Sequence, residues 1–371
     1  MCLLVQAHMA GAQIERIWLT HKNMDPGRVI VNWETSQPGN SVVHYGPAPS
    51  AEHIRATGEN ATLHHVEIPL QPKAPVYYYR VQTGSDRSVI ASFKGYTENE
   101  LRVGVIADLQ GKPELPGLLK DNAHIVMTAG DNVPNLWEGG DGRKGCTKPY
   151  SRLIDAYREL FRTTIFMPVL GNHDKEVRPR GSAPPEEPVY DVNATAFRAF
   201  FELPDDEWKW HFDVPAFDLR FISLDLNHIS DMGTTWQACH PFAAGSEQFE
   251  WYDRLTQQTD RRFVVTLYNE QNASMRNKEG RRWHQMFRRG TICITGFGYF
   301  AERAVFEGHP YCNTSLNGRG DRYPDPHSRF LTGQDNYVLL TLHREPSEMI
   351  VDLKALDGTV LDRTRYTGRT P

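Results

Sequence analysis

Apolar and polar residues alternate in short runs over the first quarter of the chain, most clearly in VIVNW at residues 29–33. Turn residues such as QPGN at 37–40 separate the runs, which recur at residues 14–19, 29–34, 41–45, 64–70, 76–82 and 89–93. Alternation punctuated by turns is typical of β-strands. Six or seven short strands at this interval predict an immunoglobulin-like sandwich over residues 14–96, with Trp33 as its core aromatic residue.

The pattern changes after a polar linker at residues 97–100. Strand-like runs then alternate with helix candidates, which is typical of an α/β domain, here residues 101–371. Two segments place apolar residues on one helical face, residues 150–161 and residues 246–255, the second with Ser246 as its N-cap. Further strands are expected at residues 219–224, 262–267, 292–295, 336–342 and 349–356, and the last two predict a hairpin.

Polar motifs follow three of the apolar runs in the second domain. The runs at residues 103–107, 124–129 and 165–170 lead into ADLQ at 107–110, GDN at 130–132 and GNHD at 171–174. The carboxyl ends of buried parallel strands meet at one crevice, so these polar side chains are expected to converge. Two carboxylates, an amide and an imidazole form an oxygen-rich set for a hard divalent ion with an acid/base group beside it. The residues concerned are Asp108, Asp131, Asn172 and His173.

Composition narrows the class of partner. The 371 residues include 39% hydrophobic and 23% charged residues, and the net charge is −5 without a long run of one sign. This balance argues against a nucleic-acid-binding surface. No apolar run approaches the length of a membrane-spanning helix. We therefore expect a small-molecule partner, and the sequence leaves the oligomeric state open.

Residues 1–13 allow two interpretations. CLLV at 2–5 followed by AGA at 10–12 has features of a truncated export signal, although it lacks a basic lead-in. The other interpretation is a disordered N-terminus. Only the first would imply a secreted or periplasmic location.

The order and spacing of the three motifs resemble the calcineurin-like metallophosphoesterase superfamily, whose pattern runs D-x-H, G-D, G-N-H-[DE], H, G-H-x-H. The resemblance is strongest to its purple acid phosphatase branch and spans most of the chain. VHYG at 43–46 and YYYRV at 77–81 are similar to the fibronectin type III-like N-terminal domain of that branch. The resemblance implies a four-layer metallophosphoesterase-like β-sandwich flanked by helices, behind an all-β fibronectin type III-like domain.

Roles at the site follow from the resemblance, position by position. Asp108 and Asp131 would hold metal ions, with Asp131 bridging two of them, and Asn172 would be a further ligand. His173 would contact the substrate phosphate and serve the leaving group, and we expect Asp174 to orient its imidazole. The implied chemistry is in-line displacement at phosphorus, with metal ions offsetting the developing charge.

The second half of the chain departs from the family pattern. Asn269, or less closely Tyr268, stands where the family has its first late histidine. GFGY at 296–299 takes the place of G-H-x-H, so that Phe297 and Tyr299 replace both histidines. A second register, GHPY at 308–311, would keep one histidine as His309. Gln110 also stands where many members carry the histidine of the first motif.

The remaining donors favour a reduced metal site, because imidazole binds zinc, iron and manganese far better than an amide oxygen does. We expect one divalent ion (Mg, Ca, Mn or Zn) on Asp108, Asp131, Asn172 and Asn269, and no standard two-metal centre. The expected catalytic residues are His173, Asp174 and Tyr299, and the expected further pocket residues are Gln110, Asn132, Glu270 and Arg303.

Three functions stay open at this point. The first is an atypical phosphoesterase-like hydrolase with a single or weak divalent metal site, in which Arg281, Arg282 or Arg303 would clamp phosphate. The second is a metal-independent enzyme on the same fold, acting on another substrate such as a carbohydrate. The third is a catalytically dead pseudophosphatase that serves as a binding module.

Overall fold

The computed structural model describes residues 12–71, 73–96, 99–111, 113–140, 142–318 and 322–368. Most of the N-terminal segment, which was open to two interpretations, and part of the linker at 97–100 lie outside these residues. Within them the chain forms nineteen strands in two sheets, with seven α-helices and four short 3-10 helices. The α/β class expected from the sequence is confirmed.

The first sheet contains twelve strands, ten of them in the order β19-β18-β17-β7-β8-β9-β1-β2-β4-β5, with β3 and β6 paired to β2 and β4. Its strands are β1 (Ile14–Thr20), β2 (Arg28–Gly46), β3 (His53–Pro69), β4 (Val76–Thr83), β5 (Asp86–Arg87), β6 (Ala91–Lys94), β7 (Glu100–Ile106), β8 (Ile125–Thr128), β9 (Ile165–Met167), β17 (Asn336–His343), β18 (Glu348–Ala355) and β19 (Val360–Tyr366). β7, β8 and β9 are parallel neighbours. β17 and β18 form the predicted hairpin.

The second sheet has seven strands in the order β10-β11-β12-β13-β15-β14-β16. They are β10 (Trp210–Val214), β11 (Leu219–Ser223), β12 (Phe263–Tyr268), β13 (Ile292–Thr295), β14 (Ala301–Phe306), β15 (His309–Asn313) and β16 (Ser328–Thr332). β11, β12, β13 and β15 run parallel, and every residue of β12, β13 and β15 is buried. Burial on both faces explains why β12 and β13 are mainly apolar and do not alternate between apolar and polar residues.

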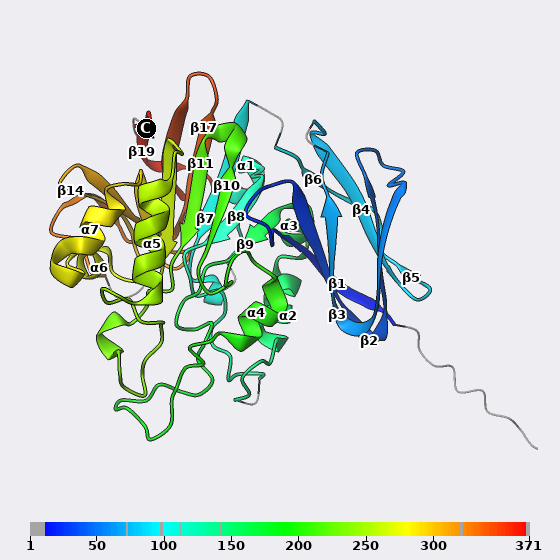
Figure 1. The fold of residues 1–371 in the computed structure, drawn as a ribbon, viewed down its shortest axis with the longest axis horizontal. Helices are drawn as coiled ribbons and strands as arrows, with labels where there is room; N and C mark the ends of the chain where they lie inside the picture. The colour runs from blue at the N-terminus through cyan, green and yellow to red at the C-terminus, as the bar shows by residue number, and fades with distance from the viewer. Residues whose placement is uncertain are drawn as a thin grey trace, which may run out of the picture.

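The helices are short and lie outside the sheets. They are α1 (Pro116–Asp121), α2 (Lys148–Ala156), α3 (Arg158–Thr163), α4 (Thr195–Phe201), α5 (Glu247–Gln258), α6 (Asn272–Arg276) and α7 (Arg282–Phe287), with 3-10 turns η1 (Leu109–Gly111), η2 (Pro215–Phe217), η3 (Ile229–Asp231) and η4 (Lys278–Arg281). Figure 1 shows the second sheet layered between the first sheet and α5 to α7. None of the helices in the described ranges is both long and apolar enough to span a bilayer.

Two local predictions need correction. The expected turn at residues 37–40 lies inside β2, which accommodates it through register shifts around Gly39 against β3. The helix expected at residues 150–161 is broken into α2 and α3 at Tyr157, whose backbone is not helical (φ −130°, ψ 41°). By contrast, Ser246 caps α5 as predicted, because its hydroxyl accepts a hydrogen bond from the Phe249 N–H.

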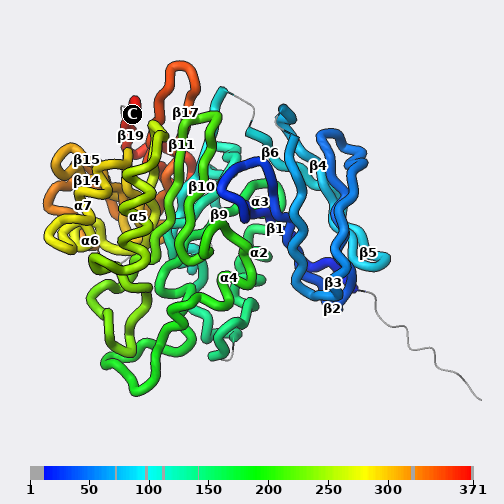
Figure 2. Tube along the Cα trace, in the orientation of Figure 1, coloured from blue at the N-terminus to red at the C-terminus, as the bar shows by residue number. Residues whose placement is uncertain are grey.

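The N-terminal strands are joined to the rest of the first sheet through β1. This strand pairs with β2 on one side and, through Leu19 opposite Ile165, with β9 on the other. The fully buried Trp18 stacks on Phe200 of α4 with 4.2 Å between ring centroids. Figure 2 shows β2 to β6 at one end of the molecule and β14, β15 and β19 at the other. Trp33 is fully buried, as predicted.

Candidate functional site

Two aspartates lie side by side just beyond the tips of β7 and β8. Both residues have a left-handed backbone conformation (φ 58° for Asp108 and 55° for Asp131), which lets the chain turn sharply at the end of each strand. The Asp108 N–H donates to the Gly130 carbonyl at 3.4 Å, and the Leu109 N–H donates to the Asp131 carbonyl at 3.0 Å. Burial and the neighbouring charge of Asp131 raise the pKa of Asp108, and burial raises the pKa of Asp131.

The third motif packs directly onto Asp131. The His173 N–H donates to Asp131 Oδ1 at 3.2 Å. Gly171 touches the same aspartate, because a Cβ at this position would lie 2.1 Å from Asp131 Oδ1 and 2.3 Å from its backbone nitrogen. Asn172, between them, is buried. The structure therefore brings together the residues of all three motifs.

Asp174 does not have the role expected from the sequence. Its side chain is fully buried and accepts hydrogen bonds from the Gly171 N–H (2.8 Å) and from the Asn132 side chain (2.9 Å) and N–H (3.3 Å). Burial raises the pKa of Asp174 to about 7. The residue fastens the second and third motifs to each other, and the His173 ring is held by a different carboxylate.

That carboxylate belongs to Glu176. Its Oε2 lies 3.0 Å from His173 Nδ1. Burial alone would lower the pKa of His173, but the negative charges of Asp131 and Glu176 raise it to about 9. The raised pKa favours the protonated ring, whose Nδ1 faces Glu176.

β12 and the segment after it contribute Asn269 and Glu270. The Asn269 side-chain amide donates to the Ala129 carbonyl at 3.0 Å and packs on Gly130, so Asn269 lies beside the turn that carries Asp131. Glu270 Oε2 accepts a hydrogen bond from the Ile229 N–H at 3.0 Å. Glu270 therefore holds the loop that follows β11.

The loop after β13 lies over the tips of β7 and β8. A Cβ at Gly296 would lie 2.3 Å from the Ala107 Cβ and 2.6 Å from the Ala129 carbonyl oxygen. Phe297 and Tyr299 follow in this loop and are half-buried. His309 of the alternative register is instead the first residue of β15, at the opposite ends of the parallel strands. Its Nε2 lies 3.6 Å from Cys293 Sγ. Only the register at 296–299 is at the site.

Gln110 and Asn132 stay next to the carboxylates, whereas Arg303 does not. Gln110 lies in η1, which begins directly after Asp108. Its Nε2 is buried without a hydrogen-bond partner among the described residues, and the same holds for Asn132 Oδ1. Arg303 makes a bidentate ion pair with Asp362 of β19, at 2.5 and 3.1 Å. The prediction that Arg303 lines the pocket was wrong, because its side chain reaches from β14 of the second sheet to Asp362 of the first sheet.

Several residues at the site belong to none of the motifs recognised in the sequence. The Ser315 hydroxyl donates to Asp108 Oδ2 from just beyond β15, another strand tip whose polar continuation could have been noticed. Glu176 could have been noticed as a carboxylate three residues after His173. His228 had no usable signal, since it lies in the loop after β11 and reaches the site only through the tertiary fold.

The expected arginines lie elsewhere. Arg281 pairs with Glu307, and the guanidinium of Arg282 lies over the Phe249 ring. Arg180 lies near His228, because both side chains face Asp231 Oδ2, from which His228 Nδ1 lies 3.9 Å away. Its guanidinium donates to Asp231 at 2.6 Å.

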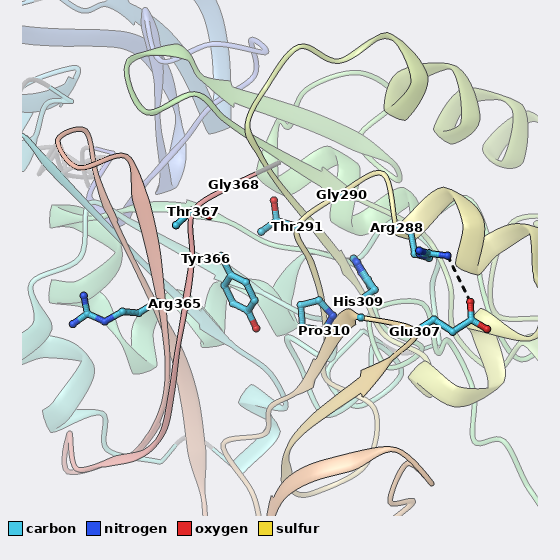
Figure 3. A pocket seen from close by; sticks show the side chains of 11 residues that line it. Arg288, Gly290, Thr291, Glu307, His309, Pro310, Arg365, Tyr366, Thr367 and Gly368 are labelled. Carbon is cyan, nitrogen blue, oxygen red and sulfur yellow. Dashed lines mark ion pairs between the residues drawn. The ribbon is translucent and has the colours of Figure 1, made fainter. Parts of the chain in front are cut away.

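The cavity drawn in Figure 3 is separate from this site. It has a volume of about 490 Å³ and lies at the edge where β13 and β15 begin and β19 ends. Pro310 and Tyr366 lie between Arg288 and Arg365, and Arg288 faces Glu307 at 3.6 Å. A cavity of about 90 Å³ does adjoin the site, beside Asn132.

The contact between Gly171 and Asp131 gives a stability prediction. Gly171→Ala is expected to lower the free energy of unfolding by about 1–3 kcal/mol, because the new methyl group overlaps backbone that cannot rotate away. Gly58→Ala is the matched control, since a Cβ there meets nothing within 4 Å. Urea unfolding of both variants measures the difference, and equal stabilities would contradict the described packing.

Comparisons with known proteins bear on the fold. No protein-family model and no curated protein sequence matches the chain. The structure is similar to purple acid phosphatase PPD1 from yellow lupin (Lupinus luteus) seeds, with a TM-score of 0.70 and 14% identity over 96% of this chain and 75% of the lupin chain.

Two further solved structures match less well. GAP50, the anchor in the inner membrane complex of Plasmodium, has a TM-score of 0.47 and 14% identity over 73% of this chain and 90% of its own. A predicted phosphoesterase from Streptococcus pneumoniae has a TM-score of 0.33 and 11% identity over 73% and 98%. TM-scores below 0.5 do not support an assignment of fold. The similarity to the lupin structure shows that this chain has a calcineurin-like metallophosphoesterase fold.

Proposed function

We propose that this protein is a phosphoesterase-like hydrolase that works with one hard divalent cation. The observation that carries the proposal is the convergence of Asp108, Asp131, Asn172 and Asn269 on the tips of β7 and β8. Carboxylate and amide oxygens are the ligands that Mg²⁺ and Ca²⁺ prefer. A divalent cation bound there would offset negative charge on a phosphate ester.

The same residues do not suit two transition-metal ions. Among the described residues, no group of three or more His, Cys, Asp or Glu side chains is placed to hold a metal ion. His173 Nδ1 is turned to Glu176. In the loop after β13, Phe297 offers no donor. One oxygen-bound ion is therefore the proposal that the donor chemistry supports.

His173 is the proposed general acid. Glu176 at Nδ1 and Asp131 at the backbone N–H fix the residue from two sides. This arrangement leaves Nε2 as the ring atom that can give a proton to the leaving-group oxygen. The Ser315 hydroxyl, bonded to Asp108, fixes one of the ligand carboxylates.

The N-terminal strands are proposed to be a fibronectin type III-like domain of residues 14–96 that braces residues 101–371. Their all-β content and the buried Trp33 support this proposal. Its contact with the second domain includes the stacking of Trp18 on Phe200.

Phosphate release from an aryl phosphate, measured with Mg²⁺, Ca²⁺, Mn²⁺, Zn²⁺ or EDTA, tests the function. We expect turnover that requires a divalent ion, a loss of about 10²–10⁴-fold in kcat on His173→Asn, and loss of metal-dependent turnover on Asp131→Asn. His343→Asn and Asp260→Asn, at exposed or half-exposed positions, are the matched controls.

Other outcomes overturn the proposal in distinguishable ways. Full turnover in EDTA that His173→Asn abolishes would indicate the metal-independent enzyme. Binding of phosphate esters without turnover under any metal would indicate a binding module. Isothermal titration of Mg²⁺ into the wild type and Asp131→Asn tests the cation site without relying on activity.

A further inference from the structure

We propose that the site prefers phosphate esters of aromatic alcohols, because an aromatic strip of His228, Phe297 and Tyr323 leads away from the strand tips beside the carboxylate cluster and can bind the ring of the leaving group. This inference rests on the proposed function and names its substrate class. The three side chains come from segments far apart in the sequence, after β11, after β13 and before β16.

His228 forms the inner end of the strip. Its ring meets Phe297 of the loop that lies over the tips of β7 and β8. The loop that carries His228 is held at the strand tips, since the Asn269 N–H donates to the Leu226 carbonyl at 3.2 Å and the Ile229 N–H donates to Glu270 Oε2 at 3.0 Å. The inner end is therefore fixed relative to the carboxylate cluster.

Phe297 and Tyr323 continue the strip outward. The Phe297 ring meets His228 edge to face at 6.2 Å and lies 5.7 Å from the Tyr323 ring. Exposure rises along the strip, from half-buried His228 and Phe297 to Tyr323, which is 42% exposed. Phe297 also follows Gly296, which is packed on the tips of β7 and β8. The strip thus begins at the strand tips and ends in solvent.

This geometry suits a flat apolar leaving group. A phosphate ester bound at the carboxylate cluster would place its leaving group beside the loops that carry His228 and Phe297. Aromatic pairs contribute about 0.5–1.5 kcal/mol beyond the area they bury, which corresponds to roughly a two- to twelve-fold effect on kcat/KM. An alkyl group lacks this contribution, so the strip is expected to discriminate between the two kinds of ester.

The experiment compares 2-naphthyl phosphate with butyl phosphate in the wild type, Phe297→Leu and Tyr323→Leu, at saturating Mg²⁺. Leucine keeps the site apolar and removes the ring. We expect each variant to lose about two- to ten-fold in kcat/KM for the naphthyl ester and to change less than two-fold for the butyl ester. Comparing variants within each ester cancels the difference in intrinsic reactivity. Tyr366→Leu, at the edge shown in Figure 3, is the matched control.

The outcomes separate the two proposals. No turnover of either ester by the wild type, with any divalent ion, overturns the proposed function. Turnover in which both esters respond equally to Phe297→Leu and Tyr323→Leu overturns the ring subsite and leaves the function intact. Calorimetric binding of naphthyl and butyl phosphonates, which are not hydrolysed, gives the same ratio without a chemical step. Equal loss of both phosphonates in the variants would also overturn the subsite.

Discussion

Replacing Lys175 by methionine is expected to lower the free energy of unfolding by about 3–5 kcal/mol. Lys175 directly follows the GNHD motif, and its side chain is fully buried. Its Nζ donates to Asp225 and, at 2.5 Å, to the Ala238 carbonyl. Methionine has a similar length but no charge, so the variant leaves the fully buried Asp225 carboxylate without its main counter-charge.

The remaining partners of Asp225 would compensate only in part. His240 donates to its Oδ2 from the backbone at 3.0 Å and from Nδ1 at 2.7 Å, and that ring stacks on Trp208. Burial alone would raise the pKa of Asp225. The charge of Lys175 and the hydrogen bond from His240 outweigh burial and hold this pKa below its usual value. Without Lys175 the carboxyl group is expected to take up a proton or draw in water.

Urea unfolding at pH 7 measures this effect. The matched control is Arg365→Met, which removes an exposed cation paired with Glu348 at 3.2 Å and should change stability by less than about 1 kcal/mol. The double variant Lys175→Met with Asp225→Leu should recover much of the loss, because it removes both charges. A loss below 1 kcal/mol for Lys175→Met alone would contradict the buried ion pair.

Acidification from pH 6.5 to 4 is expected to unfold the protein, because several histidines are buried in the neutral form. Burial lowers the pKa to about 4 for His21, His64 and His124, and to about 3 for His309. At each of these histidines the unfolded chain, with a pKa near 6.5, then binds more protons than the folded chain. The stability that they contribute is fully present above pH 6.5 and is lost as the pH falls toward 4.

His21 shows the size of the effect. Its Nδ1 lies 2.5 Å from the Arg28 carbonyl and its Nε2 lies 2.7 Å from the Tyr96 hydroxyl, so the neutral ring is hydrogen-bonded on both sides. Asp25 favours the charged form, but burial outweighs it. A shift of this size corresponds to about 3 kcal/mol from one residue.

The slope of unfolding free energy against pH, measured by urea unfolding between pH 5 and 6, tests this linkage. His21→Gln should reduce the slope by about 1 kcal/mol per pH unit, since one proton fewer is taken up on unfolding. His343→Gln, at a half-exposed position, is the control. A slope unchanged in His21→Gln would show that this histidine is not the buried neutral group described here.

Local patterns account for much of the fold. Alternation predicted the strands of the N-terminal part, continuous apolar runs predicted β8 and β12, and two successive strand-like runs predicted the hairpin of β17 and β18. The turn at 37–40 became a shift of register in β2, because pairing with β3 before and after this segment overrides local turn chemistry. The predicted helix ends at Tyr157, whose backbone leaves the helical region.

The sequence by itself determined which strand tips carry the carboxylates, because motif order and apolar runs are local properties of the chain. Only the tertiary structure decided that Glu176 and not Asp174 holds His173, that Arg303 turns to Asp362, and that Ser315 and His228 join the site. The physical reason is that a side chain takes the partner that burial and neighbouring elements leave within reach. Distances between residues far apart in sequence are set by sheet pairing and loop packing, which no local pattern encodes.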